Sequence, residues 1–335
     1  MRPRPGRAGS VRPRPHEPGT STADARHAGA THVRIAGGAV AAGALALIAL
    51  ASTEAAADQP RRTPAAIDVD RDATPPGRVE LGFDGGAPVE GYGVSVAARL
   101  VERPIEIVDG DGNVSQPVRR RESLVLGGAM SLLASAVVDV RLPLVHQVGD
   151  RSRAFGETRR LDRFTVGDLR FGVRLRVGGK RESGAFLRGE LTLPTGNDDH
   201  YAGEASWAFA WSLIGRAALP GGVILAAAGG IRLRGAEVLV ADRLVGNELH
   251  GAVGVVVPLR DPRISATVEL GAIAGDSVAG ATGPSPVHAG AGLVVRPTRW
   301  LAAGVRAGAG LVDQIGSPRA YAMLELAYLG TLAGP

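Results

Sequence analysis

Residues 301–311 read LAAGVRAGAGL, and this stretch shows most plainly how the chain is built. Every second residue from Leu301 to Leu311 is leucine, valine or alanine, and the residues between them are alanine, glycine and Arg306. A side-chain period of two is the pattern of a β-strand with two different faces. The stretch therefore predicts a strand with a smooth apolar face and a second face of small or charged residues.

The same alternation recurs from about residue 91 to residue 329 and predicts about twelve strands, each of roughly ten residues. Residues 124–138 and 223–231 are so rich in Ala, Gly and Leu that a helix remains an alternative there. The clearest strands are expected at 137–145, 168–177, 186–193, 263–273, 299–311 and 320–329, and softer ones at 92–101, 122–132, 205–215, 223–234, 247–257 and 287–296.

The connections between these segments alternate between long and short. Short connections carry Gly, Pro and Asp, which are turn residues, as in 219–222 and 260–263. Long polar connections are expected near 102–121, 146–166, 194–204, 235–246, 275–286 and 312–319. Outer-membrane barrels combine short periplasmic turns with long extracellular loops. We therefore predict an all-β fold, a closed antiparallel transmembrane β-barrel of about twelve strands with such turns and loops.

The N-terminal region has the features of an export signal. An uncharged run from Ile35 to Ser52 precedes an Ala-x-Ala site, which predicts cleavage after Ala57. A transmembrane anchor is the alternative, because about 18 apolar residues approach the spanning minimum. The arm before the run is long, and Val33 would be an ordinary start if read from a GTG codon. The predicted organisation is a signal peptide with its long arm at 1–57, a flexible periplasmic lead-in at 58–88, the barrel at 89–330 and a tail at 331–335.

Charge and composition exclude several classes of partner and chemistry. Seven of the 38 basic and three of the 33 acidic side chains lie in residues 1–57, so the rest of the chain is nearly neutral. No basic face for nucleic acid is expected. The chain has no cysteine, which excludes disulfides, thiolate metal sites and cysteine nucleophiles. The histidines of the expected barrel do not have metal-ligand spacing, so we predict no metal and no cofactor.

The two faces of each strand have different expected environments. Charge at mid-depth on a lipid-facing surface costs roughly 2–4 kcal/mol, so the charged face should line the lumen. Aromatic residues make up 4% of the chain, which is few for two interfacial girdles, and the candidates are Trp207, Trp211, Trp300 and Tyr328. The predicted lumen residues are Arg99, Asp139, Arg141, Arg170, Arg174, Arg176, Arg188, Glu190, Arg232, Arg234, Glu248, Glu269, Arg306 and Glu325.

Four short motifs carry a resemblance. They are Val166-Gly-Asp-Leu-Arg170, Leu193-Pro-Thr-Gly196, Val245-Gly-Asn-Glu-Leu249 and Gly316-Ser-Pro-Arg319. With them, residues 77–330 resemble the outer-membrane β-barrels of GC-rich (myxobacterial-type) bacteria that form the N-terminal domain of OmpA-like proteins. More distantly, they resemble barrels linked to hydrocarbon uptake. The peptidoglycan-binding domain that often follows such barrels is not in this sequence, so the resemblance does not imply cell-wall anchoring.

These observations favour a porin-like transport protein in the outer membrane of a Gram-negative bacterium, contacting outer-membrane lipid and the barrel-assembly machinery. The expected function is passive passage of small solutes, with a preference for anions because of the lumen arginines. One alternative is a non-conducting structural barrel that displays its loops. A second is a barrel-embedded hydrolase using a histidine such as His250, which lies near Glu248, together with a serine or an acid. No nucleophile motif supports this enzyme, and a soluble periplasmic β-protein is the remaining alternative.

Overall fold

The computed structural model describes residues 91–108, 114–150, 161–179, 183–196, 202–204, 206–236, 238–240, 243–275, 285–312 and 317–331. The predicted signal peptide, the arm, the lead-in to residue 88 and residues 332–335 lie outside these ranges. Within them, the regular structure is β apart from one 3-10 turn, Pro220–Gly222. No helix in the described ranges is long and apolar enough to cross a membrane.

The described residues form fifteen strands. The first three strands are longer than the rest. Their bounds are β1 Gly91–Val108, β2 Val114–Leu133, β3 Ala136–Gly149, β4 Leu161–Val166, β5 Leu169–Gly179, β6 Gly184–Leu193, β7 Ala208–Ala218, β8 Ile224–Arg234, β9 Val238–Val240, β10 Arg243–Val245, β11 Glu248–Pro258, β12 Ile264–Gly275, β13 Val287–Val295, β14 Leu301–Gly310 and β15 Ala320–Thr331.

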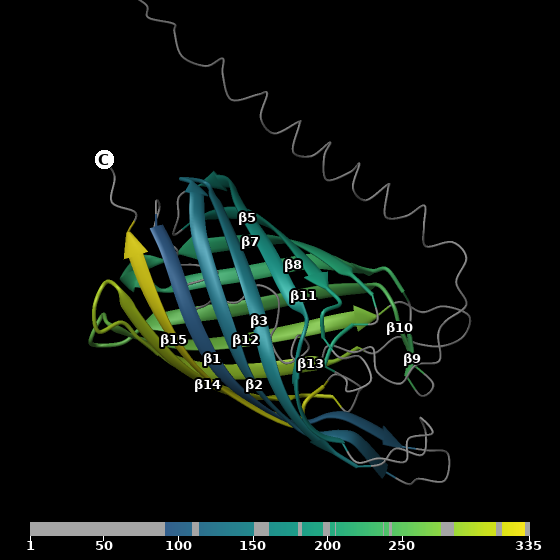
Figure 1. The fold of residues 1–335 in the computed structure, drawn as a ribbon. Coiled ribbons are helices and arrows are strands. Elements are labelled where there is room, and N and C mark those ends of the chain that lie inside the picture. Colours follow the sequence, from purple (N-terminus) through teal and green to yellow (C-terminus); the bar gives the residue numbers. More distant parts are fainter. Residues whose placement is uncertain are drawn as a thin grey trace, which may run out of the picture. The chain divides into compact units, whose positions relative to one another are not determined.

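Antiparallel pairing joins these strands into a closed ring (Figure 1). β1 pairs with β15 on one side and with β2 on the other, and the β2–β3 pairing closes the sheet. β4 and β5 follow one another along the same edge of β3 and act as one interrupted strand. With β9 and β10 apart as a small two-stranded sheet, the described part of the ring has twelve strand positions. The predicted fold class is confirmed.

The interruption between β4 and β5 has a local cause. Pro143 on β3 faces the break and has no amide N–H to donate to a neighbouring strand. The chain passes it with Gly167, whose amide donates to the Pro143 carbonyl oxygen at 2.8 Å. A Cβ at Gly167 would lie 2.7 Å from Cγ of Pro143, so only glycine fits this approach without a shift. The break leaves Asp168 outside both strands.

The two ends of the barrel differ in their connections. At one end, here called the short-turn end, short connections join β2 to β3, β5 to β6, β7 to β8, β11 to β12 and β13 to β14. Gly91 and Thr331 also pair at this end. At the other, the long-loop end, longer connections join β6 to β7, β8 to β11, β12 to β13 and β14 to β15. The expected alternation of short and long connections is therefore present.

The first expected long loop, 102–121, is mostly strand, so that prediction was wrong, whereas the second, 146–166, is strand at both ends and its middle, 151–160, lies outside the described residues. β1 and β2 continue through most of 102–121, and β3 and β4 take up the two ends of 146–166. Ile105 and Val118 in the first of these extensions are fully buried, which explains why the sheet continues. Bulges interrupt the β1–β2 register there. The extended β1–β2 hairpin projects past the neighbouring strands at the lower right of Figure 1.

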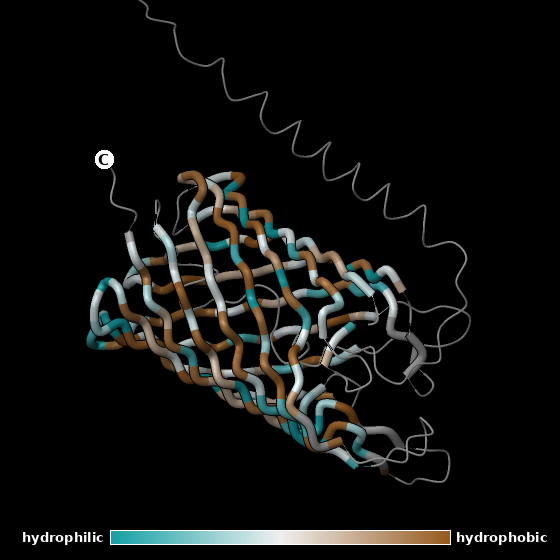
Figure 2. The backbone as a smooth tube through the Cα atoms, viewed as in Figure 1, coloured by the Kyte–Doolittle hydropathy of each residue, from teal (hydrophilic) through white to brown (hydrophobic). Residues whose placement is uncertain are grey.

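Along the strands, hydrophobic and hydrophilic residues alternate in Figure 2. On β12, Val268 and Leu270 are exposed, whereas their neighbours Thr267 and Glu269 are buried. This arrangement inverts that of a water-soluble protein, because the exposed outer face is apolar and the buried inner face is charged. The helix alternative for 124–138 and 223–231 is also wrong, since both stretches pair as strands.

Candidate functional site: the charged interior of the barrel

Charged side chains are concentrated on the buried face of the strands. Eleven of the fourteen residues predicted to line the lumen are buried, and Arg141, Arg176 and Glu190 are partly exposed. Arg176 lies at the short-turn end, where its guanidinium donates to the Ala134 carbonyl oxygen at 3.3 Å. The buried ones are Arg99, Asp139, Arg170, Arg174, Arg188, Arg232, Arg234, Glu248, Glu269, Arg306 and Glu325.

Glycines on the inner face let side chains reach across an intervening strand. Asp139 on β3 accepts two hydrogen bonds, each 3.2 Å, from Arg188 on β6, although β5 lies between them. The residue of β5 opposite Asp139 is Gly172, and a Cβ there would lie 2.7 Å from the Asp139 carboxyl carbon. From the sequence, glycine was interpreted as a turn residue in the short connections. The structure adds that the glycines of the inner face open space for these long-range ion pairs.

Four arginines and two carboxylates share one side of the interior, which we call the arginine wall. Its residues are Arg141, Arg170, Arg174 and Arg188 with Asp139 and Glu190, on β3, β5 and β6. Arg141 lies directly opposite Arg170, and Arg174 directly opposite Arg188. Like charges opposite each other on neighbouring strands repel. Asp139 and Glu190 bind Arg188, and Asp139 also binds Arg141. With four arginines and two carboxylates, the wall has two more positive than negative groups.

A second charged cluster lies on β8, next to β7, at the long-loop end. Arg232 and Arg234 both bind the carboxylate of Glu204, with Nη2 of Arg232 2.7 Å from Oε1 and Nε of Arg234 2.8 Å from Oε2. We call these two arginines the carboxylate clamp. Arg234 is also fixed from the other side by Glu248, at 2.7 Å. Arg234 lies opposite Ala208, which lies opposite Thr192, which in turn lies opposite Arg170. The clamp and the arginine wall are therefore connected along one row of paired residues.

Glu204 comes from the connection between β6 and β7 and was not predicted from the sequence. Its backbone amide donates to Oδ2 of Asp168 at 2.7 Å, and the amide of Gly196 donates to Oδ1 of the same carboxylate at 2.9 Å. Burial would raise the pKa of Glu204, but the charges of Arg234 and Arg232 outweigh burial and hold that pKa below its ordinary value. Asp168 thus holds a charged loop carboxylate inside the barrel.

Three of the four motifs that carried the family resemblance meet at this place. Asp168 belongs to the first motif and Gly196 to the second, and the Thr195 hydroxyl accepts a hydrogen bond from the Leu169 amide at 2.8 Å. In the third motif, the Gly246 carbonyl oxygen and the Asn247 side chain both accept hydrogen bonds from Arg234. Short motifs that are far apart in sequence therefore build the clamp and its support.

The opposite side of the interior is closer to electrical balance. Arg306 on β14 binds Glu269 on β12 at 2.7 Å, across the glycines of β13. The Tyr321 ring lies over Gly290 and Gly308, where a Cβ would collide with it. Arg99 and Glu325 are buried on neighbouring strands. Among the described residues, no group of three or more His, Asp or Glu side chains could hold a metal ion.

A serine and a histidine meet across Gly230. The Ser212 hydroxyl oxygen on β7 lies 2.9 Å from Nε2 of His250 on β11, and both residues are buried. Their strands are separated by β8, where Gly230 faces both residues. The sequence pointed to His250 but not to Ser212, because the pairing follows only from strand register.

Replacing Gly230 with alanine is expected to reduce the free energy of unfolding by about 1–3 kcal/mol. The new Cβ would collide with the Trp211 carbonyl oxygen and lie 2.6 Å from Nε2 of His250, so backbone would have to move. Gly215→Ala is the matched control, because nothing lies within 4 Å of its Cβ position on β7. Urea unfolding in lipid vesicles measures both variants. Equal stability of the two would contradict the close packing of β7, β8 and β11.

The four girdle candidates lie near the two ends of the outer face. Trp207 precedes β7 at the long-loop end, and Trp211 follows within that strand. Trp300 precedes β14 at the short-turn end, where Tyr328 lies opposite Leu301 and its ring centroid is 6.3 Å from that of Tyr92. The Arg299 guanidinium lies 3.8 Å from the centroid of the Trp300 ring. Their function as girdles stays a prediction.

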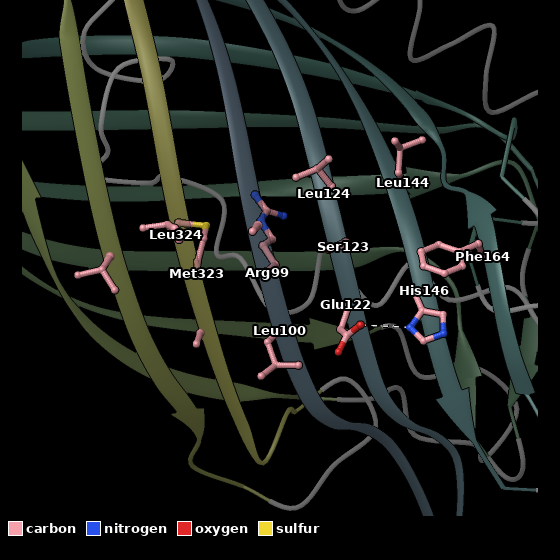
Figure 3. Close-up of a pocket in the computed structure, with 13 residues that line it drawn as sticks. Arg99, Leu100, Glu122, Ser123, Leu124, Leu144, His146, Phe164, Met323 and Leu324 are labelled. Atoms are coloured by element: carbon pink, nitrogen blue, oxygen red, sulfur yellow. Dashed lines mark hydrogen bonds and ion pairs between the residues drawn. The ribbon is translucent and has the colours of Figure 1, made fainter.

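The outer face also carries an apolar groove of about 590 Å³ (Figure 3). Ala98 on β1 lies between Leu324 and Leu124 on the neighbouring strands, and its small side chain leaves the gap. The polar end of the groove is formed by Glu122 and His146, whose side chains are 3.1 Å apart. The His146 ring stacks on Phe164, which is 83% exposed. The lining is mainly hydrophobic, so the groove differs in chemistry from the charged interior.

No protein-family model matches this chain, and no curated protein matches its sequence. Solved structures do resemble it. An outer membrane channel from Pseudomonas putida F1 is 17% identical, with 76% of this chain and 99% of that chain covered and a TM-score of 0.57. The CymD monoaromatic hydrocarbon channel is 8% identical, with 82% and 100% covered and a TM-score of 0.44. At such identities the likeness concerns the fold, and the first structure supports a closed antiparallel β-barrel.

Proposed function

We propose that this chain is an outer-membrane channel for the passive passage of small solutes, and that it favours anions. The observation that carries the proposal is the arginine wall, where four guanidinium groups face two carboxylates on the inner surface of a closed barrel. Inside a narrow lumen with low-dielectric walls, such an excess attracts anions and repels cations. Rings of charged side chains set selectivity in this way in other pores.

The proposed location follows from the outer face. A sheet that spans hydrocarbon must close, because every backbone group needs an internal partner there. This barrel is closed, and large apolar side chains such as Val268, Leu270 and Leu324 are exposed on its outer surface. The fold likeness to an outer membrane channel from Pseudomonas putida F1 agrees with this location. Export through a signal peptide cleaved after Ala57, and the finer resemblance to OmpA-like barrels, stay predictions.

Chloride release from liposomes tests the function. Vesicles loaded with KCl and containing the refolded protein are diluted into isosmotic potassium gluconate with valinomycin present, and a chloride electrode follows the release. We expect release well above that from protein-free vesicles. Protein that is inserted and heat-modifiable, but releases no chloride, would favour the alternative of a structural barrel closed by its own ion pairs. The internal pairs at Arg188 and Arg306 are the observation that favours this alternative.

A barrel-embedded hydrolase is the second alternative, and the 2.9 Å contact between Ser212 and His250 favours it. A histidine within hydrogen-bond reach of a serine can act as its general base. A fluorophosphonate probe decides the question, because it reacts covalently with activated serines. Labelling that is lost in Ser212→Ala and kept in Ser265→Ala would support the enzyme, and absence of labelling would remove it.

A further inference from the structure

The clamp has the geometry of a carboxylate-binding site. One carboxylate, that of Glu204, lies between the guanidinium groups of Arg232 and Arg234, with each oxygen bound by a different arginine at 2.7 and 2.8 Å. Charge-assisted hydrogen bonds of this length are the strongest that proteins make with carboxylates. All three side chains are at most 3% exposed, so water competes little for these contacts.

The clamp is oriented by groups other than Glu204. Glu248 binds Nη1 of Arg234 at 2.7 Å, and the Gly246 carbonyl oxygen accepts a hydrogen bond from the same guanidinium. The backbone amide of Arg234 donates to the Asn247 side chain at 3.1 Å. These contacts come from β11 and the connection before it, not from the connection that carries Glu204. Arg234 would therefore keep its position if another carboxylate took the place of the glutamate.

Glu204, in contrast, is attached to the site from outside the strands. It lies between β6 and β7, and its amide is held by Asp168. Its side chain presents to the clamp two aliphatic carbons that end in a carboxylate, and propionate has the same carbon skeleton. The charges of Arg234 and Arg232 hold the pKa of Glu204 below its ordinary value, which favours the charged form of the competitor.

We propose that the clamp is the binding site for the carboxylate group of an anionic organic solute, and that Glu204 occupies this site as an internal competitor. The inference deepens the proposed anion pathway and rests on it. A solute carboxylate that displaces Glu204 forms the same two ion pairs with the clamp, and the displaced glutamate carboxylate moves into water at the long-loop end, so the exchange leaves no buried charge unpaired. The clamp lies in the cross-strand row that continues to Arg170. A solute that leaves the clamp would therefore meet the arginine wall next.

Chemical rescue tests the proposal without requiring conduction. Glu204→Ala removes the carboxylate of the glutamate and the methylene beside it, and so frees the place between the two arginines for the carboxylate of propionate. Folded variant protein is titrated with sodium propionate, and its thermal unfolding midpoint is read from the shift between folded and unfolded gel bands. We expect propionate to raise the midpoint of Glu204→Ala with an apparent affinity at least tenfold higher than for the unmodified protein. Propionamide and sodium chloride at equal concentration should have little effect on either.

Two further variants keep the test specific. Glu204→Ala combined with Arg232→Met should lose the response to propionate, because one arm of the clamp is gone. Glu269→Ala removes another buried carboxylate that pairs with an arginine, Arg306, and should respond at least tenfold more weakly. Equal propionate responses in Glu204→Ala and Glu269→Ala, or no response in folded Glu204→Ala, would overturn the proposal. A failure of the anion pathway appears separately, as absent chloride release from the unmodified protein.

Discussion

Replacing both Arg170 and Arg174 with glutamate is expected to invert the ion selectivity of the reconstituted barrel, from chloride-favouring to potassium-favouring. The arginine wall would then present two guanidinium groups and four carboxylates in place of the reverse. Both arginines are buried on β5, so their charges are poorly screened by salt. We expect the chloride-to-potassium permeability ratio to fall by about tenfold or more, equivalent to about 1.4 kcal/mol. The reversal potential in a KCl gradient should change sign.

The neutral double variant, Arg170→Gln with Arg174→Gln, is the control for this change. It removes two charges without adding two of the opposite sign, so its reversal potential should lie between those of the other two proteins. Each variant is first shown to fold by its heat-modifiable mobility on gels. If the folded glutamate variant kept the chloride preference of the unmodified protein, the arginine wall would not control selectivity.

Replacing Val268 with arginine should destabilise the barrel by roughly 2–4 kcal/mol in lipid vesicles. Val268 lies near the middle of β12 and is 54% exposed on the outer face, so the new charge would lie deep in hydrocarbon. Denaturant unfolding in vesicles measures the change in the free energy of unfolding. In a protein whose outer face meets water, the same substitution would cost almost nothing.

Leu249→Arg is the matched control for depth. Leu249 is the second residue of β11, at the long-loop end, and its side chain is 61% exposed. Near the interface an arginine costs about 0–1 kcal/mol, because its long side chain reaches water. Equal costs at Val268 and Leu249, or no cost at either, would contradict the membrane-spanning orientation of the strands.

The sequence was a good guide wherever a rule of period two applied. Segment 263–273 alternates, and the structure places Val268 outside and Glu269 inside. The same rule failed in the extensions of β1–β3, because Arg119, Arg120 and Arg121 interrupt the alternation and resemble a polar loop. Their strand structure depends on pairing with β1 and β3, which a local pattern does not contain.

The interior was predictable as a list of charges but not as a set of contacts. The pairing of Asp139 with Arg188 requires the register of β3, β5 and β6 and the missing side chain at Gly172. Glu204 and Asp168 lie outside the strands, where no periodicity marks a residue as buried. The short motifs around Asp168, Gly196 and Gly246 were the one signal that could have located the clamp, since they carried the resemblance and meet at this place.

The measurement that tests the proposed anion channel most directly is the single-channel current of the refolded, heat-modifiable protein in a planar bilayer under a KCl gradient. We expect steady current steps and a reversal potential on the chloride side, because the arginine wall has an excess of arginine over carboxylate. No current from protein shown to be inserted would contradict the channel, and steps with a potassium-favouring reversal potential would contradict the assigned effect of the arginine wall.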